Sequence, residues 1–145
     1  IPTGNIHRIL GENHPPTEAR RYAKEMADTI PLHDGVPVFD WILLGIGPDG
    51  HTASLFPGKT NYSEQTLTVV ATHPQSGQLR VSKTARVLKA AKRITFLVLG
   101  PGKQDIVNEI HLHSAQDLPY PAAKIISENG ETQWYLDKDA AQKIV

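Results

Sequence analysis

The chain has 145 residues, of which 39% are hydrophobic and 21% charged, a balance that allows a single buried core. Fifteen Lys and Arg residues balance fifteen Asp and Glu residues, so no general attraction to nucleic acid or to an anionic membrane is expected. The absence of cysteine excludes disulfides, thiolate metal sites and cysteine nucleophiles, and no apolar run reaches the roughly 20 residues of a bilayer span. We therefore expect a cytoplasmic protein with no nucleic-acid or membrane partner; the oligomeric state stays open.

The first half of the chain predicts two strands, two helices and a glycine-rich turn. Residues 6–10 alternate in polarity and predict a short strand, and helical spacing after Pro15 and Pro16 predicts a helix over residues 18–30. Residues 38–44 are almost continuously apolar, which is typical of a strand buried on both faces. Residues 45–50 then predict a turn, and residues 51–56 a short helix.

The second half repeats the alternation of strands and helices. The expected elements are strands at 66–72, 79–82, 93–99 and 133–136, helices at 84–91 and 104–112, and a terminal helix capped by Asp137. Alternating elements imply parallel crossovers, so we predict an α/β fold with a layered, mostly parallel sheet. Trp41 and Trp134 lie within apolar strands and are expected in the core.

The densest motif is the glycine turn that follows the strand at 38–44. Gly45, Gly47 and Gly50 satisfy the spacing G-x-G-x-x-G, so a dinucleotide-binding turn is one interpretation. That interpretation expects an acidic residue about 20 positions later at the end of a second strand, whereas Glu64 lies in a polar stretch. The spacing alone is therefore weak support for a dinucleotide.

Asp49 and His51 in the same turn offer a second interpretation. Imidazole titrates near neutral pH and a carboxylate can orient it, so the pair suits proton transfer at the carboxyl edge of a sheet. The alternative is structural: Asp49 makes the turn and His51 caps the short helix expected after it. The residue types alone favour neither.

The remaining histidines give no metal site. His111 and His113 are two positions apart and would face different sides of a helix, so they are not expected to share a metal. Four others fall in or near loops and are expected to be solvated: His7, His14, His33 and His73.

Longer motifs connect the chain with a known family. Residues 36–40 and 42–57, with the run Gly-Ile-Gly-Pro-Asp-Gly-His-Thr-Ala-Ser-Leu-Phe-Pro, resemble the signature of the 6-phosphogluconolactonase family. Later blocks are similar in order and spacing: residues 80–82, 87–91, 96–100, 102–103, 121–123 and 134–137.

The resemblance implies a fold and a domain boundary. It implies a Rossmann-like sheet with helices on both faces, like that of ribose-5-phosphate isomerase and CoA transferase. Residues 1–145 would be one α/β domain that forms the C-terminal portion of a longer domain. Its N-terminal strands would be missing, together with a glycine and serine turn that helps to hold the sugar phosphate.

The resemblance also implies roles for particular residues. His51 would be the general base that activates water for hydrolysis of 6-phospho-D-glucono-1,5-lactone, and Asp49 would orient it. Gly45, Gly47 and Gly50 would lie against the substrate, with N–H groups around Gly47 near the developing oxyanion. No cofactor and no metal are implied.

Two cationic residues would bind the phosphate group. Lys103 follows a glycine loop at a helix start, where free N–H groups favour an anion, and Arg80 is a second candidate. Two departures from the family pattern affect this region. Residues 74–79 lack a lysine that the family usually has ahead of the arginine, and residues 83–86 are unusually basic.

Two further alternatives remain at this point. An amino-sugar phosphate isomerase or deaminase of the same superfamily would carry a carboxylate soon after the histidine, and residues 52–57 contain none. A parallel sheet without its first strands could also be inactive by itself, because sheet edges and half of the phosphate site would be unfilled.

Overall fold

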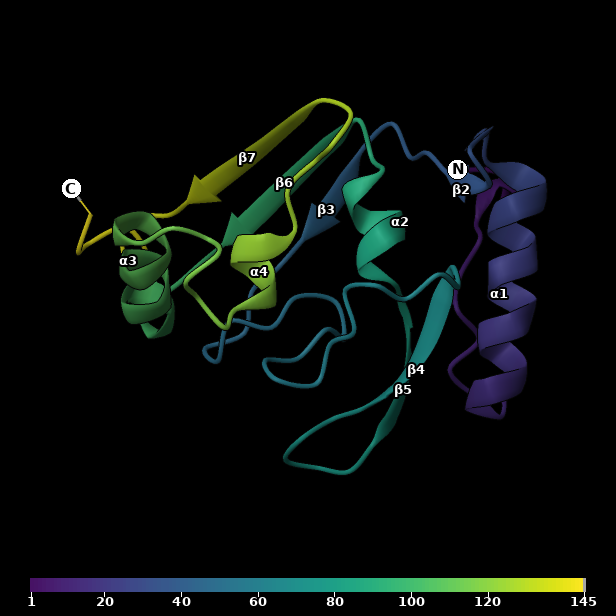
Figure 1. Cartoon of the computed structure of the whole chain (residues 1–145), viewed down its shortest axis with the longest axis horizontal. Coiled ribbons are helices and arrows are strands. Elements are labelled where there is room, and N and C mark those ends of the chain that lie inside the picture. Colours follow the sequence, from purple (N-terminus) through teal and green to yellow (C-terminus); the bar gives the residue numbers. More distant parts are fainter. Residues whose placement is uncertain (145) are drawn as a thin grey trace.

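The computed structural model describes residues 1–144 and has a parallel sheet at its centre. Strands β3 (Ile42–Leu44), β6 (Arg93–Val98) and β7 (Glu131–Leu136) lie in that order, and both neighbouring pairs are parallel (Figure 1). The other elements are η1 (Thr3–Asn5), α1 (Pro15–Thr29), β1 (Leu32–His33), β2 (Val36–Pro37), β4 (Thr68–Thr72), β5 (Leu79–Lys83), α2 (Ala85–Lys89), η2 (Pro101–Lys103), α3 (Gln104–Leu112) and α4 (Pro121–Lys124). The α/β class and the parallel sheet are confirmed.

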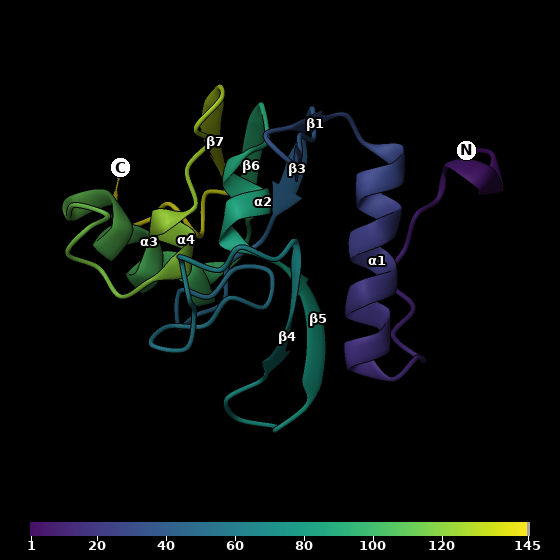
Figure 2. The same cartoon turned by 45° about the vertical axis from the view of Figure 1, so that its right-hand side comes forward.

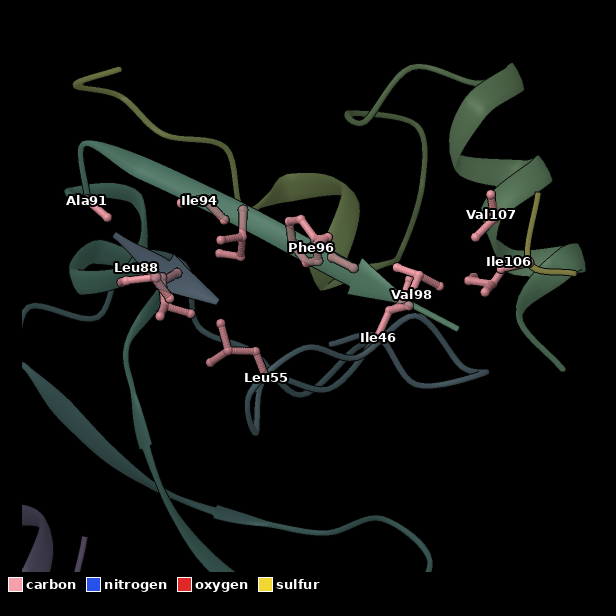
Figure 3. Close-up of a cluster of buried hydrophobic side chains, with 14 residues drawn as sticks. Ile46, Leu55, Leu88, Ala91, Ile94, Phe96, Val98, Ile106 and Val107 are labelled. Carbon is pink, nitrogen blue, oxygen red and sulfur yellow. The ribbon is translucent and has the colours of Figure 1, made fainter. Parts of the chain in front are cut away.

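The main core lies on one face of this sheet. The even-numbered residues of β6, Ile94, Phe96 and Val98, are buried and meet side chains of α2, α3 and α4 (Figure 3). Phe96 stacks on Trp134 of β7, with the two ring centroids 4.2 Å apart. Burial of these apolar side chains holds the three helices against the sheet.

Most of the odd-numbered face of the sheet is exposed within residues 1–144, although Thr95 is buried. Leu43, Leu97 and Tyr135 are each more than half exposed. Trp41 is also exposed and lies over this face, where its Nε1 donates a hydrogen bond to Oγ1 of Thr95 at 2.9 Å. Two expectations are therefore wrong for this chain: Trp41 is not in the core, and the strand at 38–44 is shorter and is buried on one face only.

A second layer joins α1 to the antiparallel hairpin β4–β5. Tyr22 and Met26 of α1 form a separate buried cluster with Val36, Val87 and Ala90. Thr68 of β4 donates a hydrogen bond to the carbonyl of Ala19 at 2.7 Å. Figure 2 shows α1 alongside this hairpin, away from the central sheet.

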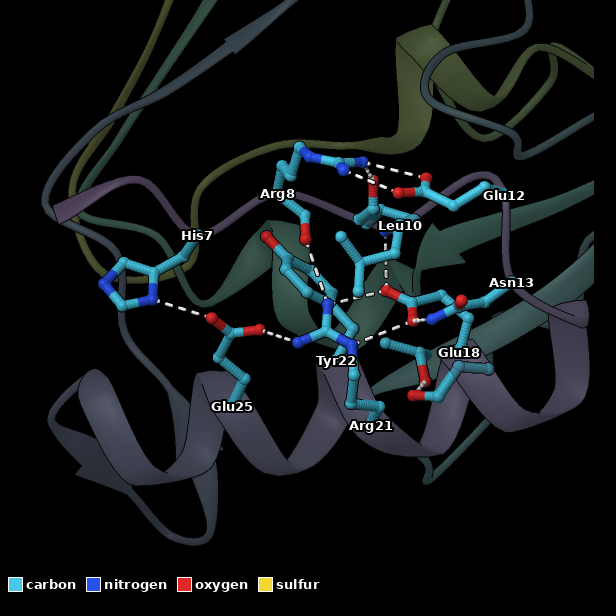
Figure 4. A network of polar contacts seen from close by, with 12 residues as sticks. His7, Arg8, Leu10, Glu12, Asn13, Glu18, Arg21, Tyr22 and Glu25 are labelled. Atoms are coloured by element: carbon cyan, nitrogen blue, oxygen red, sulfur yellow. Dashed lines mark hydrogen bonds and ion pairs between the residues drawn. The ribbon is translucent and has the colours of Figure 1, made fainter. Parts of the chain in front are cut away.

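A buried carboxylate connects α1 to the segment that precedes it (Figure 4). Glu18 is fully buried and accepts hydrogen bonds from the backbone N–H of Leu10 at 2.7 Å and from Asn13 at 2.9 Å. Arg21 donates two more, at 2.8 and 2.6 Å. The hydrogen bonds from Arg21 outweigh desolvation, so the pKa of Glu18 falls to about 2.

Three predicted elements differ from the structure. Residues 6–10 form no strand, because the N–H of Leu10 binds Glu18 instead of a neighbouring strand. Residues 51–56 form turns rather than a helix, with Ala53 at a positive φ of 50°. Asp137 is followed by turns, and its carboxylate accepts the N–H groups of Ala140 and Gly100.

The remaining elements confirm their predictions to within a few residues. The helix expected at 18–30 begins three residues earlier, with Pro15 at its first position, where the missing N–H costs nothing. The helix at 104–112 matches its prediction at both ends. None of the helices in residues 1–144 combines the length and apolar character that crossing a bilayer requires.

Candidate active site

The glycine turn lies at the carboxyl end of β3 and is closed by its own hydrogen bonds. The hydroxyl of Thr52, which is buried, donates to the carbonyl of Gly45 at 2.8 Å. The N–H of Gly47 donates to the carbonyl of His51 at 2.9 Å, and the N–H of Gly50 donates to the carbonyl of Gly47 at 3.0 Å. These bonds fold residues 45–52 into one compact loop that presents Asp49 and His51 together.

Asp49 and His51 form a hydrogen-bonded pair. Nδ1 of His51 lies 2.6 Å from Oδ1 of Asp49, and the backbone N–H of His51 donates to the same oxygen at 3.2 Å. Partial burial raises the pKa of Asp49, but the hydrogen bonds from His51 outweigh it and leave that pKa below its ordinary value. A charged carboxylate at Nδ1 favours the proton there, which leaves Nε2 as the basic nitrogen. The imidazole is 24% exposed, so solvent reaches it.

Gly47 is required by the position of the imidazole. A Cβ atom at this position would overlap Nδ1 and Cε1 of His51 and would lie 2.6 Å from Oδ1 of Asp49. The backbone therefore approaches the pair more closely than any other residue would allow. Because the N–H of Gly47 already binds the carbonyl of His51, it is not free to be one of the oxyanion donors that the resemblance implied around Gly47.

The same geometry does not suit a dinucleotide. The space next to Gly47 is filled by the ring of His51, and no helix begins after the turn to offer its N-terminus to a pyrophosphate. Gly45, by contrast, has open space where its Cβ would be.

Gly50 is held from outside the turn by two residues that the sequence analysis missed. Its φ of +81° favours glycine, and a Cβ atom there would overlap the ring of Tyr120. Its carbonyl accepts the N–H of Ala122, at the start of α4, at 3.0 Å. The hydroxyl of Tyr120 binds Glu109 of α3, which raises the pKa of Tyr120. No local pattern in residues 113–123 indicates this contact.

Lys103 lies at the same edge of the sheet as the turn. It ends η2 and is the N-cap residue of α3, directly after β6, the strand that pairs with β3. Ile46 of the turn and Ile106 of α3 belong to the same buried cluster (Figure 3). The N–H of Gly100, however, donates to the carboxylate of Asp137 and is not available to an anion.

Arg80 lies on a different element from the other candidates. It is in β5, where its Nε donates to Gln78 at 3.2 Å. It lines a cavity of about 400 Å³ with Leu10, Gly11 and Ser54, and neither His51 nor Lys103 lines this cavity. The N–H of Ser54 donates to Oγ of Ser82 at 3.1 Å, which ties β5 to the residues that follow His51.

Within residues 1–144 no three His, Asp or Glu side chains are grouped as metal ligands would be. His113 uses Nδ1 to contact the carbonyl of Glu109 at 2.9 Å. The side chains brought together at the turn are thus an orientable base and its carboxylate, and this arrangement suits proton transfer.

Known proteins share this sequence and fold. The family model described as glucosamine-6-phosphate isomerases/6-phosphogluconolactonase matches residues 1–134. A protein of Aggregatibacter actinomycetemcomitans named 6-phosphogluconolactonase is 57% identical over 142 residues, which cover 98% of this chain and 60% of that protein.

Two solved structures extend the likeness to three dimensions. The crystal structure of devB protein is 66% identical, with a TM-score of 0.98, over 100% of this chain and 61% of the other. A 6-phosphogluconolactonase from Trypanosoma brucei is 28% identical, with a TM-score of 0.76, over 90% of this chain and 54% of that one. The chain thus spans about 60% of the length of the Aggregatibacter protein and of devB. It belongs to the family of glucosamine-6-phosphate isomerases and 6-phosphogluconolactonases.

Proposed function

We propose that this chain carries the catalytic base of a 6-phosphogluconolactonase, an enzyme that hydrolyses 6-phospho-D-glucono-1,5-lactone to 6-phosphogluconate in the oxidative pentose phosphate pathway. The single observation that carries the proposal is the pair of Asp49 and His51, with Nδ1 bound to the carboxylate and Nε2 left to accept a proton. The family and the names of the relatives at more than half identity support the choice of substrate.

The reaction needs one base and no cofactor. Nε2 of His51 removes a proton from water as the water oxygen adds to the lactone carbonyl carbon. The tetrahedral intermediate collapses, the bond between that carbon and the ring oxygen breaks, and the imidazolium returns the proton to the ring oxygen. Asp49 stabilises the imidazolium between these two steps, because its charge lies 2.6 Å from Nδ1.

Lys103 and Arg80 are proposed ligands of the phosphate group. Lys103 offers an ammonium group beside the start of α3, at the edge of the sheet that also carries the turn. Arg80 lines its own cavity, so in the proposal it reaches the phosphate from β5. Gly45, Gly47 and Gly50 have no side chains, so in the proposal the backbone of the turn approaches the substrate at these positions.

A cytoplasmic location is part of the same proposal. The chain contains no cysteine, which fits a reducing compartment, and the substrate is a phosphorylated intermediate of sugar metabolism.

The test measures acid release from freshly prepared lactone at a pH where spontaneous opening is slow. His51→Gln keeps the size and polarity of the side chain but has no basic nitrogen, so we expect turnover to fall by about 100-fold or more. Unchanged turnover in this variant would contradict the assignment. Because the chain spans about 60% of the length of the Aggregatibacter protein, the assay is run on this chain and on the corresponding full-length protein with the same substitution.

The amino-sugar isomerase activity of the same family is the alternative. No carboxylate follows His51 between residues 52 and 57, and the relatives at 57% and 56% identity are named as lactonases. Conversion of glucosamine 6-phosphate by the full-length protein, with no turnover of the lactone, would favour this alternative.

A further inference from the structure

Phe56 is buried but belongs to neither hydrophobic cluster of the fold. It is 2% exposed, whereas Leu55 next to it is part of the main cluster around β6. The aromatic neighbours of Phe56 are instead two histidines. Its ring centroid lies 5.0 Å from that of His51, tilted by 45°, and 5.3 Å from that of His73, nearly edge-on at 84°.

The contacts of His51 leave one side of its ring for Phe56 to fill. Asp49 binds Nδ1 at 2.6 Å, and the backbone of Gly47 lies so close that no Cβ atom would fit between. One hydrogen bond fixes the edge of an imidazole but permits the ring to pivot about it. A packed aromatic ring at 5.0 Å removes that freedom and sets the direction in which Nε2 points.

Phe56 is itself held on its backbone and on its far side. Its carbonyl accepts the N–H of Lys59 at 3.1 Å and the hydroxyl of Thr60 at 2.9 Å. His73 directly follows β4 and belongs to a turn closed by two hydrogen bonds. Its N–H donates to the carbonyl of Gln78, and its carbonyl accepts the N–H of Gly77, each at 2.9 Å. Nδ1 of His73 accepts the N–H of Ser76 at 3.2 Å, which fixes its ring. His73 is partly exposed, but its ring also contacts Phe56, which the sequence did not indicate.

We propose that Phe56 is a positioning residue for the general base, held in place by His73 of the β4–β5 hairpin. The proposal rests on the proposed function of His51. It assigns to a buried phenylalanine the task of keeping Nε2 aimed at the water that it deprotonates. The hairpin contributes to the site through this contact, in addition to carrying Arg80.

The test compares Phe56→Leu with Phe96→Leu, a control of similar burial. Both phenylalanines are fully buried, but Phe96 stacks on Trp134 rather than on a histidine. In Phe56→Leu we expect kcat to fall about tenfold with KM changed by less than about twofold, because orientation of the base is lost and binding is not. In Phe96→Leu we expect kcat within about twofold of the original chain at a temperature where the variant is folded.

A spectroscopic measurement makes the proposal independent of turnover. The Nδ1 proton of His51, held by Asp49, should give a downfield proton resonance in the NMR spectrum. We expect this resonance to broaden or disappear in Phe56→Leu and to persist in Phe96→Leu. Phe56 has no specific role in positioning His51 if Phe56→Leu keeps both the resonance and kcat. The same conclusion follows if Phe56→Leu and Phe96→Leu lose the resonance equally. Absence of lactone turnover in the original protein would contradict the proposed function, while the resonance would still decide the role of Phe56.

His73→Ala provides the second variant if Phe56→Leu does not fold. It leaves Phe56 in place and removes only the ring behind it, so we expect partial broadening of the resonance and a loss of about threefold in kcat. His33→Ala, on the exposed strand β1, is the matched control and should change neither. If His73→Ala and His33→Ala have the same resonance and the same kcat, the contact between His73 and Phe56 does not help to position His51.

Discussion

At the residue scale, the most constrained position of the candidate site is Gly47. Gly47→Ala would place a methyl group on the ring of His51, so either the imidazole or the turn must move. We expect kcat for the lactone to fall by about 100-fold, because a displacement of about an ångström is enough for such a loss. Steady-state kinetics, with circular dichroism to verify the fold, provide the measurement.

Gly45→Ala is the comparison for this prediction. Gly45 lies two residues away in the same turn, and its added methyl group would meet no atom within 4 Å. We expect it to cost much less activity than Gly47→Ala. Equal losses would mean that the turn requires glycine for its flexibility and not for the approach of His51.

At the scale of elements, the attachment of α1 depends on the ionised carboxylate of Glu18. Its pKa is lowered to about 2 from an ordinary value of 4.5, so its stabilising contribution is complete above about pH 4.5. That contribution is lost as the pH falls from about 4.5 through about 2. Urea unfolding between neutral pH and about pH 3 should show a decline in the free energy of unfolding that is smaller in Glu18→Gln.

Glu18→Gln should also lower the free energy of unfolding at neutral pH by about 2 kcal/mol, since it weakens several charge-assisted hydrogen bonds in a buried position. Glu12→Gln is the matched control. Glu12 is paired with Arg8, but both side chains are more than half exposed. Because solvent screens an exposed ion pair, Glu12→Gln should change the free energy of unfolding much less than Glu18→Gln. If Glu12→Gln lowered the free energy of unfolding as much as Glu18→Gln, the loss of a negative charge, and not its burial, would explain the effect.

At the scale of the whole molecule, the exposed face of the central sheet should govern self-association. Leu97 of β6 pairs with Tyr135 of β7, and Leu43 of β3 pairs with Thr95, two residues before Leu97 on the same face. Trp41 and Leu99 are exposed nearby in the sequence. Exposed apolar side chains grouped on one face favour association with another apolar surface. If the original chain self-associates through this face, its average mass in sedimentation rises with protein concentration. We expect a smaller rise in Leu97→Lys.

Leu112→Lys tests whether the effect belongs to this face. Leu112 is 65% exposed at the end of α3, so the substitution adds the same charge elsewhere. We expect Leu112→Lys to leave the concentration dependence of the average mass unchanged. Both variants should keep nearly the original stability, because each replaced side chain is at least half exposed.

The sequence by itself determined the elements that have strong local signals. Helical spacing and prolines located α1 and α3, and the apolar run at 93–99 located β6 within one residue. The motif around Gly47, Asp49 and His51 identified the candidate base and its carboxylate, because proton transfer requires particular residue types and these lie two positions apart. Such features depend on neighbours along the chain.

Only the tertiary structure decided which surfaces these elements meet. The run at 38–44 has the composition of a strand buried on both faces, yet Leu43 and Trp41 are exposed because no described helix covers that side. The tertiary structure also brought Phe56, His73 and Tyr120 to the turn, over separations of up to about 70 residues along the chain. Contacts over such separations depend on how the layers pack against each other, and local sequence periodicity does not predict that packing.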